Sequence, residues 1–197
     1  MEILQQGAEA VIYKDKNKVI KHRIKKEYRI NEIDEKLRKF RTKREAKVLE
    51  KIDVKKPKLI SVDNKNMKIE MEFINGDLLK DIFDKLKNRK EICIKIGKQI
   101  RQMHNQNIIH GDLTTSNMIL KNDEIYFIDF GLSFFSDKIE DKAVDLHLLK
   151  QAIRAKHYKV FYESFEEIFR AYHPDKEFMK RFEKVESRGR YKLRKGF

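Results

Sequence analysis

The segment His110–Gly131 constrains the fold of this chain more than any other. It begins with a short polar loop, HGDLTTSN, and continues with two brief apolar runs, MILK and IYFIDF. The two runs flank Asn122–Asp123, a pair of residues typical of tight turns, so the pattern predicts a β-hairpin. A hairpin folds the chain back on itself, and we expect it to bring Asp129 beside Asn117.

The chain before this segment is expected to be rich in strands. β-Branched residues in EILQQGAEAVIY and KVIKHR indicate strands on either side of a turn at Asp15–Asn17. Further strands are expected at about Lys58–Val62 and Met67–Ile74. Between these two groups, apolar residues recur at spacings of three and four, which predicts a helix over about Asn31–Ile52 that has room for a break.

Helical periodicity dominates after Gly76. The segments LLKDIFDKL and EICIKIGKQIRQMH predict two helices before the polar loop, and the chain is expected to be helical again over about Asp141–Lys184. We therefore expect an α+β fold with two lobes and a cleft between them. The N-terminal lobe would span residues 1–75, the helical C-terminal lobe residues 76–186, and a basic tail residues 187–197.

Composition excludes several classes of protein. Charged residues make up 40% of the 197 positions, and only two prolines and seven glycines occur, which argues against a disordered chain. The N-terminus does not have the pattern of a secretory signal, and no apolar run is long enough to span a membrane, so we expect a cytoplasmic protein. Cys93 is the one cysteine and is expected to be buried and inert. The net charge of +14 favours anionic partners or serves solubility alone.

Three segments carry side chains suited to phosphoryl transfer from ATP. Asp112 in the polar loop can orient an acceptor hydroxyl and receive its proton. Asn117 and Asp129 offer the hard oxygen ligands that Mg²⁺ prefers. Lys21, at the end of the strand VIK, can reach phosphates if a carboxylate holds it. Glu45 on the following helix is the favoured partner, with Glu35 and Glu50 on nearby turns as alternatives.

These residues resemble the motifs of protein kinases. HGDLTTSN is similar to the kinase catalytic loop, DFG is present at Asp129–Gly131, and VIK is similar to the strand that carries the phosphate-binding lysine. The resemblance implies a small two-lobed protein-kinase-like fold that uses ATP and Mg²⁺. Two departures are clear: the glycine loop is reduced, with one glycine, and no APE motif follows DFG, so a full activation segment is missing.

Longer stretches are similar to one group, the small RIO-related Ser/Thr kinase subunit of the KEOPS (EKC) complex, in its free-standing form. They are GAEA, MEFINGDLL, HGDLTTSNMIL, YRINEIDEKLRKFRTKREAKVL, IDFGLSFFSDKIEDKAVDL and the basic tail RGRYKLRKGF. The resemblance implies that Asp145 braces the catalytic loop. It also implies a nucleotide site built from the reduced loop, the phosphate lysine with its glutamate, and a hinge behind the adenine: Gln6, Gly7, Ala8, Glu9, Ala10, Lys21, Glu45, Met71, Glu72 and Ile74.

The same resemblance implies partners and an activity. The partners would be the threonylcarbamoyltransferase subunit that modifies tRNA adenosine and a small subunit on the N-terminal lobe, with no membrane involved. The chain would act as an ATPase switch and as a Ser/Thr kinase that autophosphorylates. Five basic residues of the tail are expected to contact tRNA or a partner subunit: Arg188, Arg190, Lys192, Arg194 and Lys195. A solvated, frayed end is the alternative reading of this tail.

Two other functions remain open from the residues alone. A small-molecule phosphotransferase can also carry an HGD loop, although the short, basic region after DFG argues against an acidic substrate pocket. A nucleotide-binding scaffold without turnover is the other possibility. Retention of Lys21, Asp112, Asn117 and Asp129 together opposes it, because a scaffold has no physical need for all four.

Overall fold

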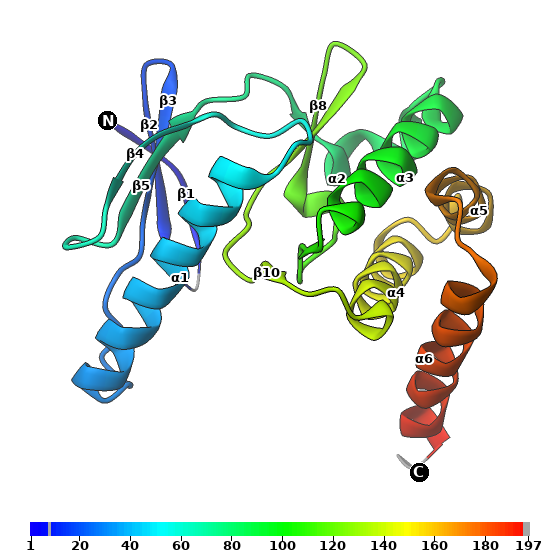
Figure 1. The fold of residues 1–197 in the computed structure, drawn as a ribbon. Helices are drawn as coiled ribbons and strands as arrows, with labels where there is room; N and C mark the ends of the chain where they lie inside the picture. The colour runs from blue at the N-terminus through cyan, green and yellow to red at the C-terminus, as the bar shows by residue number, and fades with distance from the viewer. Residues whose placement is uncertain (8, 195–197) are drawn as a thin grey trace.

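Five antiparallel strands and one long helix form the first lobe of the molecule, drawn in blue to cyan in Figure 1. This computed structural model describes residues 1–7 and 9–194. The strands are hydrogen-bonded in the order β1-β2-β3-β5-β4. Their bounds are β1 (Glu2–Gln6), β2 (Val11–Asp15), β3 (Lys18–His22), β4 (Leu59–Asp63) and β5 (Lys68–Glu72).

Helix α1 (Asn31–Lys51) crosses one face of this sheet and contacts β4 and β5. It runs without interruption, so the break allowed for in the sequence does not occur. Its C-terminal half buries Val48 and Leu49, which join the hydrophobic core. Its N-terminal half leaves Ile33 and Phe40 more than half exposed. Packing therefore holds the half of α1 that carries Glu45.

The second lobe is mainly helical. Helix α3 packs against α5, and α4 packs against α6 (Figure 1). At the first contact Gly97 is required, because a Cβ there would lie 2.2 Å from the carbonyl oxygen of Ile168. The helices are α2 (Leu79–Ile82), which leads into a 3₁₀ turn at Phe83–Lys85, α3 (Arg89–Asn105), α4 (Ile139–Lys156), α5 (Phe161–Tyr172) and α6 (Lys176–Arg194).

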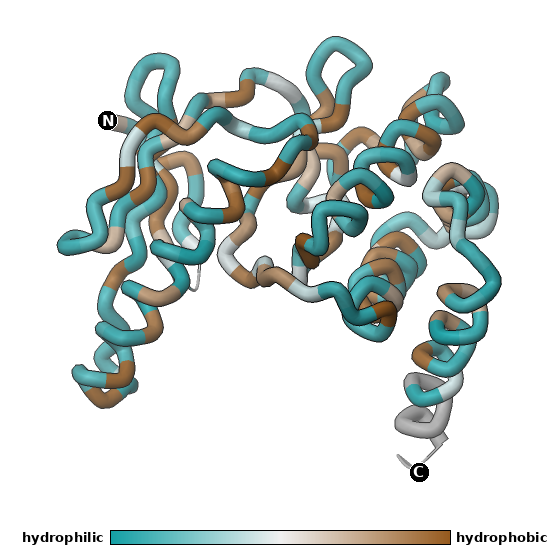
Figure 2. Tube along the Cα trace, viewed as in Figure 1, coloured by the Kyte–Doolittle hydropathy of each residue, from teal (hydrophilic) through white to brown (hydrophobic). Residues whose placement is uncertain are grey.

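The predicted hairpin is present as β8 (Met118–Lys121) and β9 (Glu124–Phe127). Its turn residues Asn122 and Asp123 both have positive φ, which is the backbone of a tight hairpin turn that Asn and Asp tolerate. Figure 2 shows hydrophilic residues at this tip and at the tip between β2 and β3. Three short strands complete the lobe: β6 (Asp77–Leu78), β7 (Ile108–Ile109) and β10 (Phe134–Phe135).

Several predicted boundaries move in the structure. The first predicted strand is divided into β1 and β2 by a turn in which the Gly7 N–H donates to the Ala10 carbonyl. The helix predicted for LLKDIFDKL is a single turn of α-helix followed by 3₁₀ geometry. Helix α6 continues through Ser187, where we predicted the start of the basic tail, so residues 187–194 are helical. Lys195 lies outside the described residues.

Two predictions about single features hold. Cys93 is free and fully buried, and burial raises the pKa of its thiol to about 12. Only residues 132–138 separate DFG from α4, and Phe134–Phe135 in this stretch pairs with β7. The activation segment is therefore as short as the sequence indicated. Among the described residues, no helix has the length and apolar character needed to cross a membrane.

Candidate active site

Lys21 is the central cation of the cleft between the lobes. It lies on β3 with only 6% of its surface exposed. Its Nζ lies 2.9 Å from Oε1 of Glu45 on α1 and 2.6 Å from Oδ1 of Asp129. The structure thus brings together three residues that we predicted to act together. It also selects Glu45 over Glu35 and Glu50, whose side chains are exposed.

Asp129 is held in a special backbone conformation. Its φ of 60° is rare for a residue other than glycine and turns its carboxylate toward Lys21. Oδ1 also accepts a hydrogen bond from the N–H of Gly131 at 3.1 Å. Burial acts to raise the pKa of Asp129, but the charge and hydrogen bond of Lys21 outweigh it and lower this pKa to about 2. Asp129 is therefore an anion at every pH where the protein would work.

Asp112 and Asn117 face each other in the polar loop. The Nδ2 of Asn117 donates to the carbonyl oxygen of Asp112 at 2.9 Å and to its Oδ2 at 2.8 Å. Both contacts use the amide nitrogen, so the side-chain oxygen Oδ1 remains for a cation. The N–H of Ile128 donates to the Asn117 carbonyl oxygen at 3.0 Å, which places the residue before Asp129 against this loop. The hairpin thus brings Asp129 beside Asn117, as the sequence predicted.

His110 shapes the loop as a buried, neutral imidazole. It is fully buried, and burial lowers the pKa of its imidazole despite the neighbouring carboxylates of Asp145, Asp129 and Asp112. Its Nδ1 accepts a hydrogen bond from the Asp112 N–H at 3.3 Å, and its Nε2 lies 3.2 Å from the Ile128 carbonyl oxygen. These partners require the neutral tautomer with hydrogen on Nε2.

Asp145 on α4 braces the same loop from below, as the resemblance implied. Its two oxygens accept hydrogen bonds from the N–H groups of His110 at 2.8 Å and Gly111 at 2.9 Å. His104 contacts the same carboxylate at 3.2 Å. Gly111 has a φ of 79° and lies close under the Leu132 carbonyl, so a larger residue would not fit there.

The oxygen donors fit a magnesium ion. Asp129 offers a carboxylate and Asn117 an amide oxygen, and Mg²⁺ takes one or two protein oxygens together with water and phosphate oxygens. No cluster of three or more His, Cys, Asp or Glu side chains able to hold a metal occurs among the described residues. A magnesium ion at these two oxygens would need further oxygen ligands from water or a bound molecule.

A hollow of 390 Å³ extends from Lys21 and Asp129 to the segment joining the lobes. Its walls are apolar at one end, with Val19, Met71 and Ile128, and charged at the other. The predicted hinge residues Met71, Glu72 and Ile74 all line it. This change from apolar to charged walls suits a nucleotide with its base at the apolar end and its phosphates at the charged end.

The hinge backbone is partly occupied by the segment before β4. The N–H of Glu72 donates to the Lys58 carbonyl at 2.9 Å, so it cannot serve an adenine. The N–H of Lys58 donates to the Glu72 side chain at 3.2 Å. The main-chain oxygen of Glu72 and the backbone of Ile74 remain the predicted contacts to a base.

The reduced glycine loop covers the phosphate end through a second hollow of 360 Å³. Gly7, Glu9 and Ala10 line it, whereas Gln6 does not, and Ala8 lies outside the described residues. Glu9 is tied to the helix side of the lobe, 2.8 Å from Arg29 and 2.8 Å from Arg41. The two hollows share Lys21 and Asp129 in their walls, so they are parts of one cleft.

Sequence reasoning missed several residues of this cleft: Gln5, Ile12, Val19, Arg23, Arg41, Gly131 and Leu132. One of them carried a signal. Arg23 stands two residues after Lys21, and side chains at i and i+2 of a strand point to the same face. The strand KVIKHR therefore places both cations toward α1.

The basic tail lies on another part of the molecule. Arg188 is paired with Glu140 at the start of α4, and Arg181 lies 3.0 Å from the same carboxylate. Burial acts to raise the pKa of Glu140, but these two arginines hold it below its ordinary value. Arg190, Lys192 and Arg194 lie in the last turns of α6.

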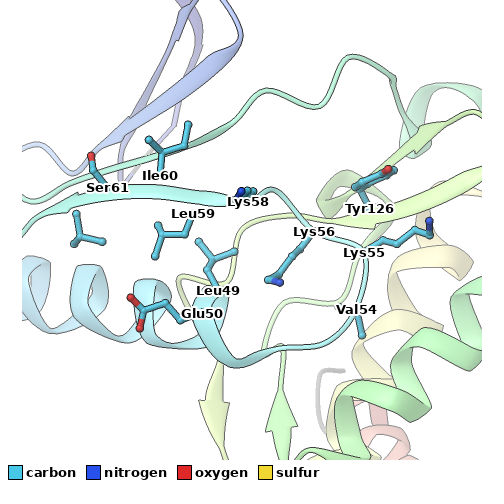
Figure 3. Close-up of a pocket in the computed structure, with 11 residues that line it drawn as sticks. Leu49, Glu50, Val54, Lys55, Lys56, Lys58, Leu59, Ile60, Ser61 and Tyr126 are labelled. Atoms are coloured by element: carbon cyan, nitrogen blue, oxygen red, sulfur yellow. The ribbon is translucent and has the colours of Figure 1, made fainter.

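A separate hollow of 740 Å³ lies on the outer side of the N-terminal lobe (Figure 3). The end of α1, the connection to β4 and Tyr126 form its walls, with Leu49, Lys56 and Leu59 among the side chains. None of the residues predicted for the nucleotide or metal site lines it.

Comparison with known proteins agrees with this geometry. The model of the RIO domain family matches residues 8–142. The KEOPS complex subunit Bud32 of Pyrococcus abyssi is 45% identical over 98% of this chain and 98% of its own length. The EKC/KEOPS complex subunit BUD32 of Enterocytozoon bieneusi is 40% identical over 96% of this chain and 98% of its own.

A longer relative shares the same region. A probable bifunctional tRNA threonylcarbamoyladenosine biosynthesis protein of Methanothermobacter thermautotrophicus is 41% identical over 96% of this chain, which spans 36% of that protein. Among solved structures, WbdD in complex with the kinase inhibitor LY294002 has a TM-score of 0.59 at 16% identity, covering 89% of this chain and 44% of that one. This likeness shows the fold alone, and it confirms the predicted kinase-like architecture. The chain belongs to the RIO domain family and, within it, to the Bud32 type of KEOPS complex subunit.

Proposed function

We propose that this chain is the ATP-using kinase subunit of a KEOPS complex and supports threonylcarbamoyladenosine modification of tRNA. The family assignment and the names of the relatives support the biological role. One observation carries the chemistry: Lys21, Glu45 and Asp129 form a contiguous ion-paired group that faces Asp112 and Asn117 across one cleft. Such an arrangement suits Mg·ATP and phosphoryl transfer.

Each side chain has a defined part in this proposal. Lys21, fixed by Glu45, binds phosphate oxygens, and Asp129 with Asn117 holds magnesium. The ion neutralises the charge of the phosphates. Asp112 lies at the cleft wall, where its carboxylate can orient the hydroxyl of a Ser or Thr side chain, or a water molecule, and accept its proton. Whether water or a protein hydroxyl is the acceptor decides between an ATPase and a Ser/Thr kinase.

The proposed partners are the threonylcarbamoyltransferase subunit, a small subunit on the N-terminal lobe and tRNA. The names of the relatives support a multi-subunit setting. The short segment between DFG and α4 supports a partner protein as the regulator, because residues 132–138 are too few to build a peptide-binding platform of their own.

Reconstitution tests the proposal. The chain is mixed with the other subunits, tRNA and the threonylcarbamoyl donor, and modified adenosine is measured with wild type and with Asp129→Ala. We expect the formation of modified adenosine to require ATP and to fall strongly in Asp129→Ala. Asp81→Asn is the matched control, since Asp81 is an exposed carboxylate on α2 outside the cleft. Equal modification by wild type and Asp129→Ala would refute the proposed role of the site.

A further inference from the structure

Arg23 is a second buried cation at the phosphate end of the cleft. Only 2% of its surface is exposed, yet it lines the same hollow as Lys21, Asp112 and Asp129. Buried arginines are rare unless their donors are paired, because an unpaired charge is costly in a low dielectric. The partners of Arg23 therefore show what this site is built for.

One arm of the guanidinium is used and the other is not. Nη2 pairs with Oε2 of Glu45, while Lys21 pairs with Oε1 of the same carboxylate. The Nη1 of Arg23 is buried and has no hydrogen-bond partner among the described residues. A buried donor without a partner destabilises the structure, because its hydrogen bond to water is lost and not replaced. Because Arg23 lines the hollow, a ligand bound there can satisfy this arm.

The charges around Arg23 favour an anion. Lys21 and Arg23 share one carboxylate, Glu45, so two positive charges face one negative charge. Asp129 balances them in this structure, but a metal ion at Asp129 would take that carboxylate away. Arg41 lines the same hollow, and the charges of Arg41 and Arg23 contribute, after burial, to a lowered pKa of Arg44. Since Arg41 is paired with Glu9, an anion here would depend on Lys21, Arg23 and a metal ion held by Asp129.

Gly131 lies close to the side chains of Arg23, Asp129 and Glu45. A Cβ at this position would lie 2.8 Å from Nη2 of Arg23, 3.0 Å from Oδ1 of Asp129 and 3.6 Å from Oε2 of Glu45. The glycine of DFG thus lets the buried pair of Arg23 and Glu45 approach the backbone beside the metal ligand. Arg23 is thus held beside Asp129, the proposed metal ligand, in the wall of the hollow.

We propose that Arg23 is a phosphate-binding residue that donates its Nη1 arm to an oxygen of the terminal phosphate of a nucleoside triphosphate. The inference rests on the proposed use of ATP in this cleft. Glu45 then serves two cations, with Lys21 and Arg23 both binding the polyphosphate. A nucleoside diphosphate lacks the terminal phosphate, so Arg23 distinguishes ATP from ADP. Arg23 also keeps Glu45 in place when Lys21 leaves Asp129 and binds phosphate instead.

The test measures the affinities of Mg·ATP and Mg·ADP by titration calorimetry for wild type and Arg23→Lys. Lysine keeps the charge and one donor for Glu45 but has no second arm. We expect the ATP affinity to fall about tenfold or more, since a hydrogen bond between charged groups is lost, while the ADP affinity changes less than about twofold. Arg89→Lys is the matched control, because Arg89 pairs with Glu163 in the helical lobe, 3.4 Å away, and lines neither hollow of the cleft. It should leave both affinities unchanged.

A second measurement covers the case in which Arg23→Lys does not fold. In wild type, the guanidinium NMR signals of Arg23, assigned through the side chain from the backbone amide, should shift on addition of Mg·ATP and much less with Mg·ADP. A folded Arg23→Lys variant that loses ATP and ADP affinity equally, or Arg23 signals that respond equally to both, overturns the inference and leaves the nucleotide site intact. A wild type that binds neither nucleotide overturns the proposed function as well.

Discussion

Lys21 and Asp129 lie 108 positions apart in the chain, yet their side chains meet at 2.6 Å. The contact joins strand β3 of the first lobe to the DFG segment of the second. It also pairs the proposed phosphate-binding lysine with a proposed magnesium ligand. A metal ion at Asp129 would share this carboxylate with Lys21 and weaken their ion pair, which would make the lysine more available to phosphate. The two binding events would then be coupled.

Acid should weaken the fold through this pair. The pKa of Asp129 is lowered from 3.8 to about 2, so its ionised form stabilises the native state above pH 3.8, and this contribution is lost as the pH falls toward about 2. We expect the free energy of unfolding to fall over this window by less in Asp129→Asn than in wild type, with Asp81→Asn behaving as wild type. Denaturant titrations at several pH values would measure it, and parallel curves for all three proteins would contradict the assignment.

Asp112→Asn should separate binding from chemistry. The amide keeps the shape and can still accept the two hydrogen bonds of Asn117, but it cannot accept a proton. We expect nucleotide affinity to change little and the rate of phosphoryl transfer to fall about 10²–10⁴-fold. Single-turnover measurements beside equilibrium titration would check this. A variant with wild-type rate and weakened ATP binding would show that Asp112 acts on the donor instead.

Gly131→Ala should be far more damaging than Gly7→Ala. A methyl group at 131 would crowd Arg23 and Asp129 at 2.8 Å and 3.0 Å, whereas at position 7 it would meet only the Ala10 carbonyl at 3.4 Å. We expect a loss of about 1–3 kcal/mol of unfolding free energy at Gly131 from overpacking. Thermal and denaturant unfolding of the two variants would measure the difference. Equal stability of both variants would show that the side chains around Gly131 can move aside at little cost.

The basic residues from position 188 onward should give RNA binding a salt dependence. Replacing Arg188, Arg190, Lys192, Arg194 and Lys195 by Gln keeps the length of the chain and removes five charges. Each lost phosphate contact should flatten the slope of log affinity against log salt by about 0.7–0.9. Filter binding of tRNA across a salt series would measure it. An unchanged slope would show that the tail does not contact phosphates.

Much of this architecture could be predicted because local patterns decided it. The turn at Asn122–Asp123 has the positive φ angles that these residue types accept, and the hairpin around it necessarily returns the chain toward Asn117. Helices α1 and α3 lie where their apolar spacing predicted helices, although the N-terminal half of α1 leaves Ile33 and Phe40 exposed. The meeting of Lys21 with Glu45 followed from motif order and is present in the structure.

The rest depended on packing between distant segments. The spacing of two from Lys21 indicates which face Arg23 is on, but its place in the basic run KHRIKK does not mark it as buried. Its burial accompanies the ion pair with Glu45 on α1. The expected flexible tail was wrong at its start, because α6 continues and Arg188 pairs with Glu140 on α4. The short α2 was equally hidden, since its periodicity did not reveal the 3₁₀ turn that ends it.

Magnesium-dependent ATP turnover by the purified chain tests the central claim most directly. It would be measured alone and with the threonylcarbamoyltransferase subunit, for wild type, Asp129→Ala and the control Asp81→Asn. The account predicts turnover that requires Mg²⁺, rises with the partner, survives in Asp81→Asn and is lost in Asp129→Ala. Bound nucleotide with no turnover under any condition would contradict it and would identify the cleft as a binding site without catalysis.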